Sequence, residues 1–176
     1  MNIWHDISPK AITKSKFTAV IEIPKGSKVK YELDKATGFL RMDRILHTST
    51  HYPANYGFIP RTYAEDGDPL DVLVICSEKL DSMSLVECYP IGVIKMLDNG
   101  ANDEKIICVP VSDPTYNEIN DISELPKHIF DEMKHFFTVY KNLEHKETVI
   151  DDVQSRDEAI SIVEKCIDRY IEFYCK

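Results

Sequence analysis

The order of apolar and polar residues separates a strand-rich first part of the chain from a helical last third. Short runs of β-branched and aromatic residues, bounded by Pro, Gly, Asn and Asp, predict six strands. They cover residues 17–23, 29–33, 39–46, 70–76, 85–96 and 105–111. Because the strands precede the helices and do not alternate with them, the pattern predicts an α+β fold.

Two helices are expected after residue 125. The first is indicated by apolar residues at intervals of three and four after Pro126, a residue that suits a first helical turn. These residues are Ile129, Met133, Phe136, Phe137, Tyr140 and Leu143. The second helix is expected to begin at Ser155, because Ser155 and Glu158 have the spacing of a capping box. Its apolar stripe is expected to contain Ala159, Val163, Cys166, Ile167, Tyr170 and Tyr174.

Length and composition are those of an ordinary globular protein. The 176 residues are close to the usual size of one domain, and no repeat or linker marks a boundary, so we expect one domain over residues 1–176. No uncharged apolar run approaches the roughly 18 residues of a membrane span. The N-terminus lacks signal-peptide features, and the five cysteines include no C-x-x-C pair. These features predict a cytoplasmic protein with reduced thiols that does not cross a membrane.

The charge balance restricts the possible partners. A formal net charge of −9 argues against nucleic acid and anionic membranes, because a phosphate backbone is bound by clustered Lys and Arg. A small phosphorylated substrate is still compatible with this charge. Such a ligand needs only local positive charge, which a few basic side chains and divalent cations provide.

The most informative segment is Asp66-Gly67-Asp68-Pro69-Leu70-Asp71, which places three carboxylates within six residues. Two like charges about 5 Å apart repel by roughly 3 kcal/mol at an effective dielectric near 20, so converging carboxylates require metal, a proton or Lys and Arg. An EF-hand is excluded, because its required glycine position is Asp71 here. A solvated acidic turn is an equally good interpretation of this segment alone.

A second acidic segment covers residues 98–105 and contains Asp98, Asp103 and Glu104. By itself it is expected to be a polar hairpin loop between two strands. Together with the first segment it suggests a site for Mg²⁺, a hard cation that prefers carboxylate oxygens and water.

Basic and aromatic residues near these segments have two interpretations each. Lys30 and Glu32 alternate with apolar neighbours, which favours a solvent-facing strand surface. Arg44 shares parity with Leu40 and Met42, so we expect it on an apolar face, with either a salt bridge or a phosphate as its partner. The tyrosines of residues 52–57 serve either core packing or hydrogen bonding to phosphate. For Tyr140 and Lys141, helix packing and a solvated lysine are an equally good explanation.

Taken together, these segments resemble the soluble family I inorganic pyrophosphatases of the bacterial type. The signature of that family around its metal-binding aspartates is D-x-D-P-x-D, which residues 66–71 match. The likeness extends through Val20-Ile21-Glu22-Ile23-Pro24, Lys30-Tyr31-Glu32, Asp43-Arg44, Tyr52-Pro53-Ala54-Asn55-Tyr56-Gly57, Gly92-Val93-Ile94-Lys95-Met96, Asp98, Asp103, Lys105, His135-Phe136-Phe137 and Tyr140-Lys141. Many members carry a Trp shortly after the Tyr-Lys pair, whereas the only Trp here is Trp4.

The resemblance implies a five-stranded, OB-like β-barrel flanked by two C-terminal helices. It also implies several Mg²⁺ ions per active site and hydrolysis of pyrophosphate to two orthophosphates. The implied metal ligands are Asp66, Asp71, Asp98 and Asp103. Asp68 is implied as the catalytic carboxylate, which receives a proton from the attacking water. The implied phosphate-binding residues are Lys30, Arg44, Tyr56, Lys105, Tyr140 and Lys141, and the residues that order water around the metals are Glu22, Glu32 and Tyr52.

Three interpretations of the function stay open from the sequence. The first is pyrophosphate hydrolysis, the second is a metal-dependent phosphoanhydride hydrolase of broader range, and the third is a metal-binding module without catalysis. The third is disfavoured, because cation binding alone requires neither Lys30 nor Arg44. Relatives of this length are usually hexamers, so the resemblance also implies a homo-oligomer.

Overall fold

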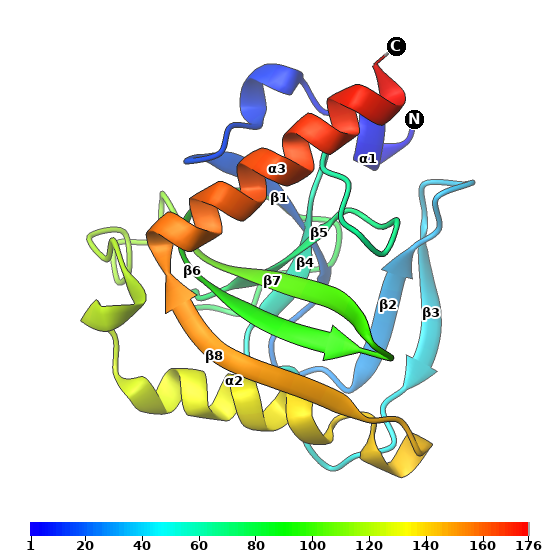
Figure 1. Ribbon diagram of the computed structural model, residues 1–176, viewed down its shortest axis with the longest axis vertical. Coiled ribbons are helices and arrows are strands. Elements are labelled where there is room, and N and C mark those ends of the chain that lie inside the picture. Colours follow the sequence, from blue (N-terminus) through cyan, green and yellow to red (C-terminus); the bar gives the residue numbers. More distant parts are fainter. Residues whose placement is uncertain (176) are drawn as a thin grey trace.

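Five strands pair into a closed ring at the centre of the fold (Figure 1). The computed structural model describes residues 1–175. Its main sheet has the strand order β1-β4-β5-β7-β6-β8, and β1 also pairs with β6, which closes the ring. The strands are β1 (Phe17–Ile23), β4 (Asn55–Ile59), β5 (Leu70–Val74), β6 (Leu85–Asp98), β7 (Ala101–Pro110) and β8 (Thr148–Ser155). The α+β class is confirmed, and the ring corresponds to the expected five-stranded barrel.

Strand directions around the ring place β5 and β7, which both carry acidic residues, side by side. All neighbouring strands are antiparallel except β5 and β7, which are parallel and bring Asp71 opposite Lys105. Outside the ring, β8 pairs antiparallel with β6. A separate hairpin of β2 (Val29–Leu33) and β3 (Leu40–Ile45) stands beside the ring, on the right in Figure 1.

The helices cover the sheet through their apolar faces. Helix α2 (Lys127–Val139) buries Phe130, Met133, Phe136 and Phe137, and α3 (Arg156–Tyr174) buries Ala159, Ile162, Val163, Cys166 and Tyr170. The short α1 (Ile3–Asp6) lies close to the C-terminal end of α3 (Figure 1). Short 3-10 turns occupy Pro9–Ala11, Ile122–Glu124 and Asn142–Glu144. Among residues 1–175, no helix combines the length and apolar character needed to cross a bilayer.

Two details of the predicted helices are wrong. Leu143 is 66% exposed, because α2 ends at Val139 and Leu143 belongs to a 3-10 turn. Tyr174, at the end of α3, is 39% exposed but packs on Trp4 and Tyr170, as its place on the apolar stripe predicts. The capping box at Ser155 does not form, since the Ser155 side chain makes no capping hydrogen bond. Instead, the first-turn amide of Arg156 donates to Asp121 Oδ1 at 2.9 Å, so a distant carboxylate caps α3.

The strand predictions missed β4 and β8, and residues 98–105 are not a loop. Strand β6 runs to Asp98 and β7 begins at Ala101, so only Asn99 and Gly100 make the turn. Both have positive φ, 51° and 80°, which is the conformation of a two-residue hairpin. Asp98 and Asp103 therefore lie on paired strands, which fixes their positions more firmly than a loop would.

Candidate active site

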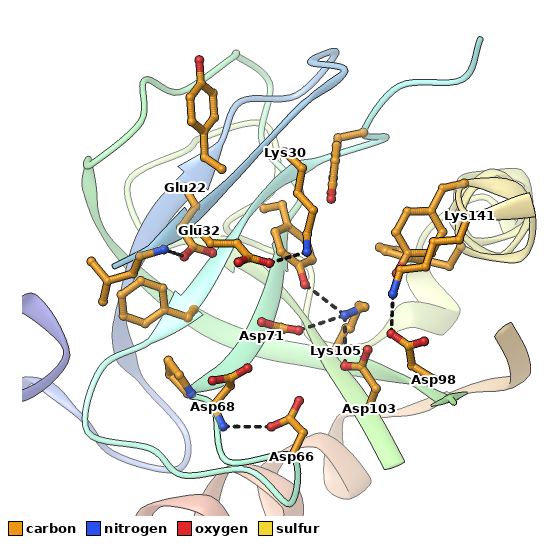
Figure 2. Close-up of a pocket in the computed structure, with 18 of the residues that line it drawn as sticks. Glu22, Lys30, Glu32, Asp66, Asp68, Asp71, Asp98, Asp103, Lys105 and Lys141 are labelled. Atoms are coloured by element: carbon orange, nitrogen blue, oxygen red, sulfur yellow. Dashed lines mark hydrogen bonds and ion pairs between the residues drawn. The ribbon is translucent and has the colours of Figure 1, made fainter. Parts of the chain in front are cut away.

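One cavity of about 250 Å³ gathers nearly all the residues that the sequence singled out (Figure 2). Its charged lining consists of Glu22, Glu32, Asp66, Asp68, Asp71, Asp98 and Asp103, together with Lys30, Lys35, Lys105 and Lys141. Its aromatic lining consists of Tyr31, Tyr52, Tyr56, Phe58, Phe137 and Tyr140. Of the proposed site residues, only Arg44 is outside this lining. The chain thus brings together side chains from β1, β2, β4, β5, the β6–β7 hairpin and the end of α2.

The acidic loop between β4 and β5 supplies Asp66 and Asp68. Gly67 between them has φ of +87°, a conformation that glycine adopts without strain. The amide of Asp68 donates to Asp66 Oδ1 at 3.0 Å, and the amide of Ala64 donates to the Asp68 carbonyl at 2.8 Å. Partial burial raises the pKa of Asp66. These bonds hold the loop in a compact turn with both carboxylates at the cavity.

Lys105 lies at the centre of the cavity and is only 2% exposed. Its ammonium donates to Asp71 Oδ2 at 2.9 Å, to Asp103 Oδ1 at 3.1 Å and to the Tyr56 hydroxyl at 3.0 Å. Burial opposes its charge, yet Asp103 and Asp71 raise the pKa of Lys105 well above its ordinary value. Burial also raises the pKa of Asp71 to about 6, although Lys105 favours its charged form. This group is a buried charge cluster whose members depend on each other.

The opposite wall of the cavity is formed by β1 and β2. Glu22 is 8% exposed and accepts a hydrogen bond from the amide of Leu33 at 2.8 Å. Burial, assisted by the nearby charge of Asp71, raises the pKa of Glu22 to about 8. Lys30 forms an ion pair with Glu32 and lies 3.6 Å from Asp43. Both residues line the cavity, where the Glu32 side chain is 51% exposed, as a solvent-facing position predicts, and that of Lys30 is only 20% exposed.

Tyr140 and Lys141 close the cavity at the end of α2. The Lys141 ammonium donates to Asp98 Oδ2 at 2.5 Å. The other carboxylate oxygen, Asp98 Oδ1, is buried without a hydrogen-bond partner among the described residues. Tyr140 is 5% exposed and packs on Phe136 and Phe137, which confirms the helix packing, and it also lines the cavity.

Arg44 differs from its expected environment. Met42, on the same strand, is 55% exposed, so this face of β3 is not apolar packing surface. A register irregularity between Lys30 and Tyr31 shifts the pairing of β2 and β3. The guanidinium forms ion pairs with Asp43 Oδ2 at 2.7 Å and Glu144 Oε1 at 2.9 Å. The salt-bridge alternative therefore describes Arg44 in this structure.

One charged lining residue was missed from the sequence. Lys35 is the second residue after β2 and forms an ion pair with Asp68. The signal that could have found it is a lysine close to the end of the strand that carries Lys30 and Glu32. Its side chain reaches the acidic loop only because the β2–β3 hairpin folds over that loop, which no local pattern indicates.

The donor set of the cavity fits divalent cations. Seven carboxyl groups face four lysines, so an excess of negative charge remains when all are ionised. Within residues 1–175, no three His, Cys, Asp or Glu side chains already converge as a metal cage. Mg²⁺ commonly binds through one or two carboxylates, with water and substrate phosphates as its other ligands. Asp98 Oδ1, which has no hydrogen-bond partner among the described residues, is a carboxylate oxygen of the kind that Mg²⁺ takes as a ligand.

Comparisons with known proteins agree with this architecture. The family model described as inorganic pyrophosphatase matches residues 19–171. Soluble inorganic pyrophosphatase 2 of Chlamydomonas reinhardtii is 50% identical over 97% of this chain and 89% of its own length. The soluble inorganic pyrophosphatase of Oryza sativa subsp. japonica is 45% identical over 95% of this chain and 78% of its own length.

Solved structures give the same result. The inorganic pyrophosphatase of Thermus thermophilus superposes with a TM-score of 0.88 at 37% identity, covering 97% of this chain and 99% of the other. That of Helicobacter pylori gives a TM-score of 0.86 at 42% identity, covering 89% and 94%. The match to the family model includes the acidic loop, the β6–β7 hairpin and α2, and the chain belongs to the inorganic pyrophosphatase family.

Proposed function

We propose that this chain hydrolyses inorganic pyrophosphate to two orthophosphates with the help of several Mg²⁺ ions. The observation that carries the proposal is a small cavity in which an acidic set and four lysines face each other. Carboxylates alone suit cations, and lysines alone suit phosphate. A site that contains both suits a phosphate substrate that is bound together with divalent cations.

The acidic residues divide into metal ligands and a proton acceptor. Asp66, Asp71 and Asp103 would hold Mg²⁺, and Asp98 would contribute to a further ion. When bound, these ions lower the pKa of a water and offset charge on the phosphates. Asp68 is assigned as the acceptor of the proton from the attacking water. Its side chain is 52% exposed at the cavity, which leaves room for that water.

The basic and phenolic residues bind and orient the phosphates. The assigned set is Lys30, Arg44, Tyr56, Lys105, Tyr140 and Lys141, and the residues assigned to ordering water are Glu22, Glu32 and Tyr52. The lysines supply charge that stabilises the transferred phosphoryl group, which is mainly positioning and electrostatics. For Arg44 this role requires that its guanidinium exchange Asp43 or Glu144 for a phosphate oxygen.

Cavity size favours pyrophosphate over larger phosphoanhydrides. Pockets for drug-sized ligands usually enclose about 300–1,000 Å³, whereas this cavity encloses about 250 Å³. We therefore place the broader phosphoanhydride hydrolase second, and the metal-binding module without catalysis third.

Phosphate release from magnesium pyrophosphate tests the function. Asp68→Asn and Asp71→Asn should lower kcat by about 100-fold or more while the variants stay folded. Asp152→Asn is the matched control, because Asp152 is 89% exposed and pairs with Lys134 away from the cavity. Parallel assays with ATP and tripolyphosphate separate the broader hydrolase. Full activity in both active-site variants would exclude the mechanism, and no phosphate release by the unmodified protein would leave only the metal-binding module.

The assembly and location are proposed from the resemblance and from composition. We propose a cytoplasmic homo-oligomer, a hexamer by resemblance, that acts as one domain over residues 1–176 and binds neither nucleic acid nor membrane. Sedimentation that shows a monomer at micromolar concentration would refute the oligomer.

A further inference from the structure

The base of the acidic loop is tied to the N-terminal helix through Trp4. The indole of Trp4 is 3% exposed, and its Nε1–H donates to the carbonyl of Thr62 at 2.9 Å. The Thr62 hydroxyl accepts a hydrogen bond from the amide of Leu70 at 2.8 Å and donates one to the carbonyl of Ile59 at 2.6 Å. The Trp4 carbonyl accepts a hydrogen bond from the amide of Arg61 at 2.9 Å. Both ends of the loop that carries Asp66 and Asp68 are thus fastened at one point.

The same tryptophan supports a lysine from the other side of the cavity. Lys35 lies in the turn between β2 and β3, and its ammonium is 5.5 Å from the centre of the Trp4 ring, a cation–π distance. Its carbonyl accepts a hydrogen bond from the Asn2 side chain at 2.8 Å. A Cβ at Gly38, in the same turn, would lie 2.7 Å from the Met1 carbonyl. The N-terminal segment therefore packs directly against this turn.

The Lys35 ammonium also forms an ion pair with Asp68 (Lys35 Nζ to Asp68 Oδ1). Both side chains are about half exposed, 47% and 52%, so this pair contributes little to the stability of the fold. Its effect is on geometry. A carboxylate on an exposed turn samples several rotamers, and a cation that is itself held over an aromatic ring restricts them.

We propose that Lys35 is a positioning residue for Asp68, and that Trp4 and Asn2 hold Lys35 in place. The proposal rests on the role assigned to Asp68 above. Lys35 differs from the other three lysines of the cavity because its contacts beyond Asp68 lead outward, to Trp4 of α1 and to Asn2. Lys30, Lys105 and Lys141 instead contact Glu32, Asp71, Asp103 and Asp98.

Steady-state kinetics distinguishes positioning from substrate binding. Lys35→Met keeps the length of the side chain and removes its charge, and Lys35→Arg restores the charge. We expect Lys35→Met to lower kcat about 10-fold to 100-fold with KM changed less than about 3-fold, because a misplaced proton acceptor affects the transition state more than substrate binding. Lys35→Arg should recover most of kcat. The control Lys134→Met, at an exposed ion pair far from the cavity, should keep full activity.

Fluorescence gives a readout that does not depend on activity. Trp4 is the only tryptophan of the chain, so its emission reports on the charge beside its ring. In metal-free protein, Asp68→Ala should change Trp4 emission, because it releases Lys35. In the Lys35→Met background the same Asp68→Ala change should have no effect. Equal emission changes in both backgrounds would overturn the linkage.

The outcomes separate this proposal from the proposed function. If the unmodified protein hydrolyses pyrophosphate and Asp68→Asn is inactive, while Lys35→Met keeps full kcat, only the positioning role is overturned. If Lys35→Met raises KM at unchanged kcat, Lys35 binds substrate and the proposal is wrong. If Asp68→Asn is fully active, both the mechanism and the role of Lys35 are overturned.

Discussion

Replacing Lys105 with Met is the most direct test of the charge cluster in the cavity. Methionine has nearly the same length but leaves Asp71 and Asp103 without their shared cation. Both carboxylate oxygens lie within 3.1 Å of Lys105 Nζ. They are therefore at most about 6 Å apart, and their repulsion is about 3 kcal/mol at an effective dielectric near 20. Removing one partner of a buried ion pair generally costs about 3–5 kcal/mol, and we expect a loss in that range for metal-free protein at pH 8.

The loss should depend on pH in a defined direction. Burial already raises the pKa of Asp71 in the folded protein, and without Lys105 the folded state favours the protonated carboxyl further. A carboxyl whose pKa is higher in the folded state stabilises the fold at low pH and destabilises it as the pH rises. The destabilisation of Lys105→Met should therefore be smaller at pH 5 than at pH 8.

Urea unfolding measures this effect. The free energy of unfolding is determined for the unmodified protein, Lys105→Met and the exposed-site control Lys134→Met, after chelation, at pH 5 and pH 8 and at matched protein concentration. Mg²⁺ should restore part of the stability of Lys105→Met, because it replaces the missing positive charge. A loss below about 1 kcal/mol at pH 8, or an equal loss at both pH values, would show that Lys105 does not balance these carboxylates.

Three further changes test other parts of the fold. Since the pKa of Glu22 is raised from 4.5 to about 8, its contribution to stability is present below pH 4.5 and is lost as the pH rises toward 8. Metal-free protein should lose at most about 5 kcal/mol of unfolding free energy over this window, and Glu22→Gln should flatten the pH dependence in urea titrations. In Gly57→Ala, the new Cβ would lie 1.8 Å from the Val20 carbonyl, so β1 and β4 must separate, and circular dichroism should show loss of the folded state. Trp4→Phe removes the donor to the buried Thr62 carbonyl and should lower the unfolding free energy by about 1–3 kcal/mol in urea, whereas unchanged stability would show that this bond is dispensable.

The strands with uninterrupted apolar runs or regular alternation could be predicted from the sequence, and those interrupted for structural reasons could not. Residues 17–23 and 29–33 match β1 and β2 at both ends. Strand β4 was missed because Pro53, Asn55 and Gly57 are typical of turns. Gly57 is there because the Val20 carbonyl of the neighbouring strand approaches too closely for any side chain. A requirement imposed by another strand cannot be inferred from the local pattern.

The β6–β7 hairpin has a recognisable turn signal in the sequence. Asn99-Gly100 is typical of a tight two-residue turn, and its recognition would have extended both strands to Asp98 and Ala101. Strand β8 gives a weaker signal, because Asp151 and Asp152 interrupt its apolar alternation at the exposed edge of the sheet. For the candidate site, the resemblance to the family identified thirteen lining residues, whereas the residue types alone left several of them with two interpretations. The contact of Lys35 with Asp68 depends on packing between distant segments, so it cannot be inferred from the local sequence.

The register of the strands, more than the identity of any one residue, determines whether the charges meet. Asp71 lies opposite Lys105 because β5 and β7 are parallel neighbours. A slip of β7 by one residue would turn the Lys105 side chain to the opposite face, where Ile106 now packs in the core, and would leave the cavity without its central cation.

Two features fix this register. At one end, the Asn99-Gly100 turn sets the pairing of β6 with β7. At the other end, the register of β6 against β7 shifts at a bulge between Pro90 and Gly92. A Cβ at Gly92 would lie 2.3 Å from Ile122 Cγ2. Substitutions at these two sites should therefore reduce activity without touching the cavity, because they move Lys105 and Asp103 relative to Asp71.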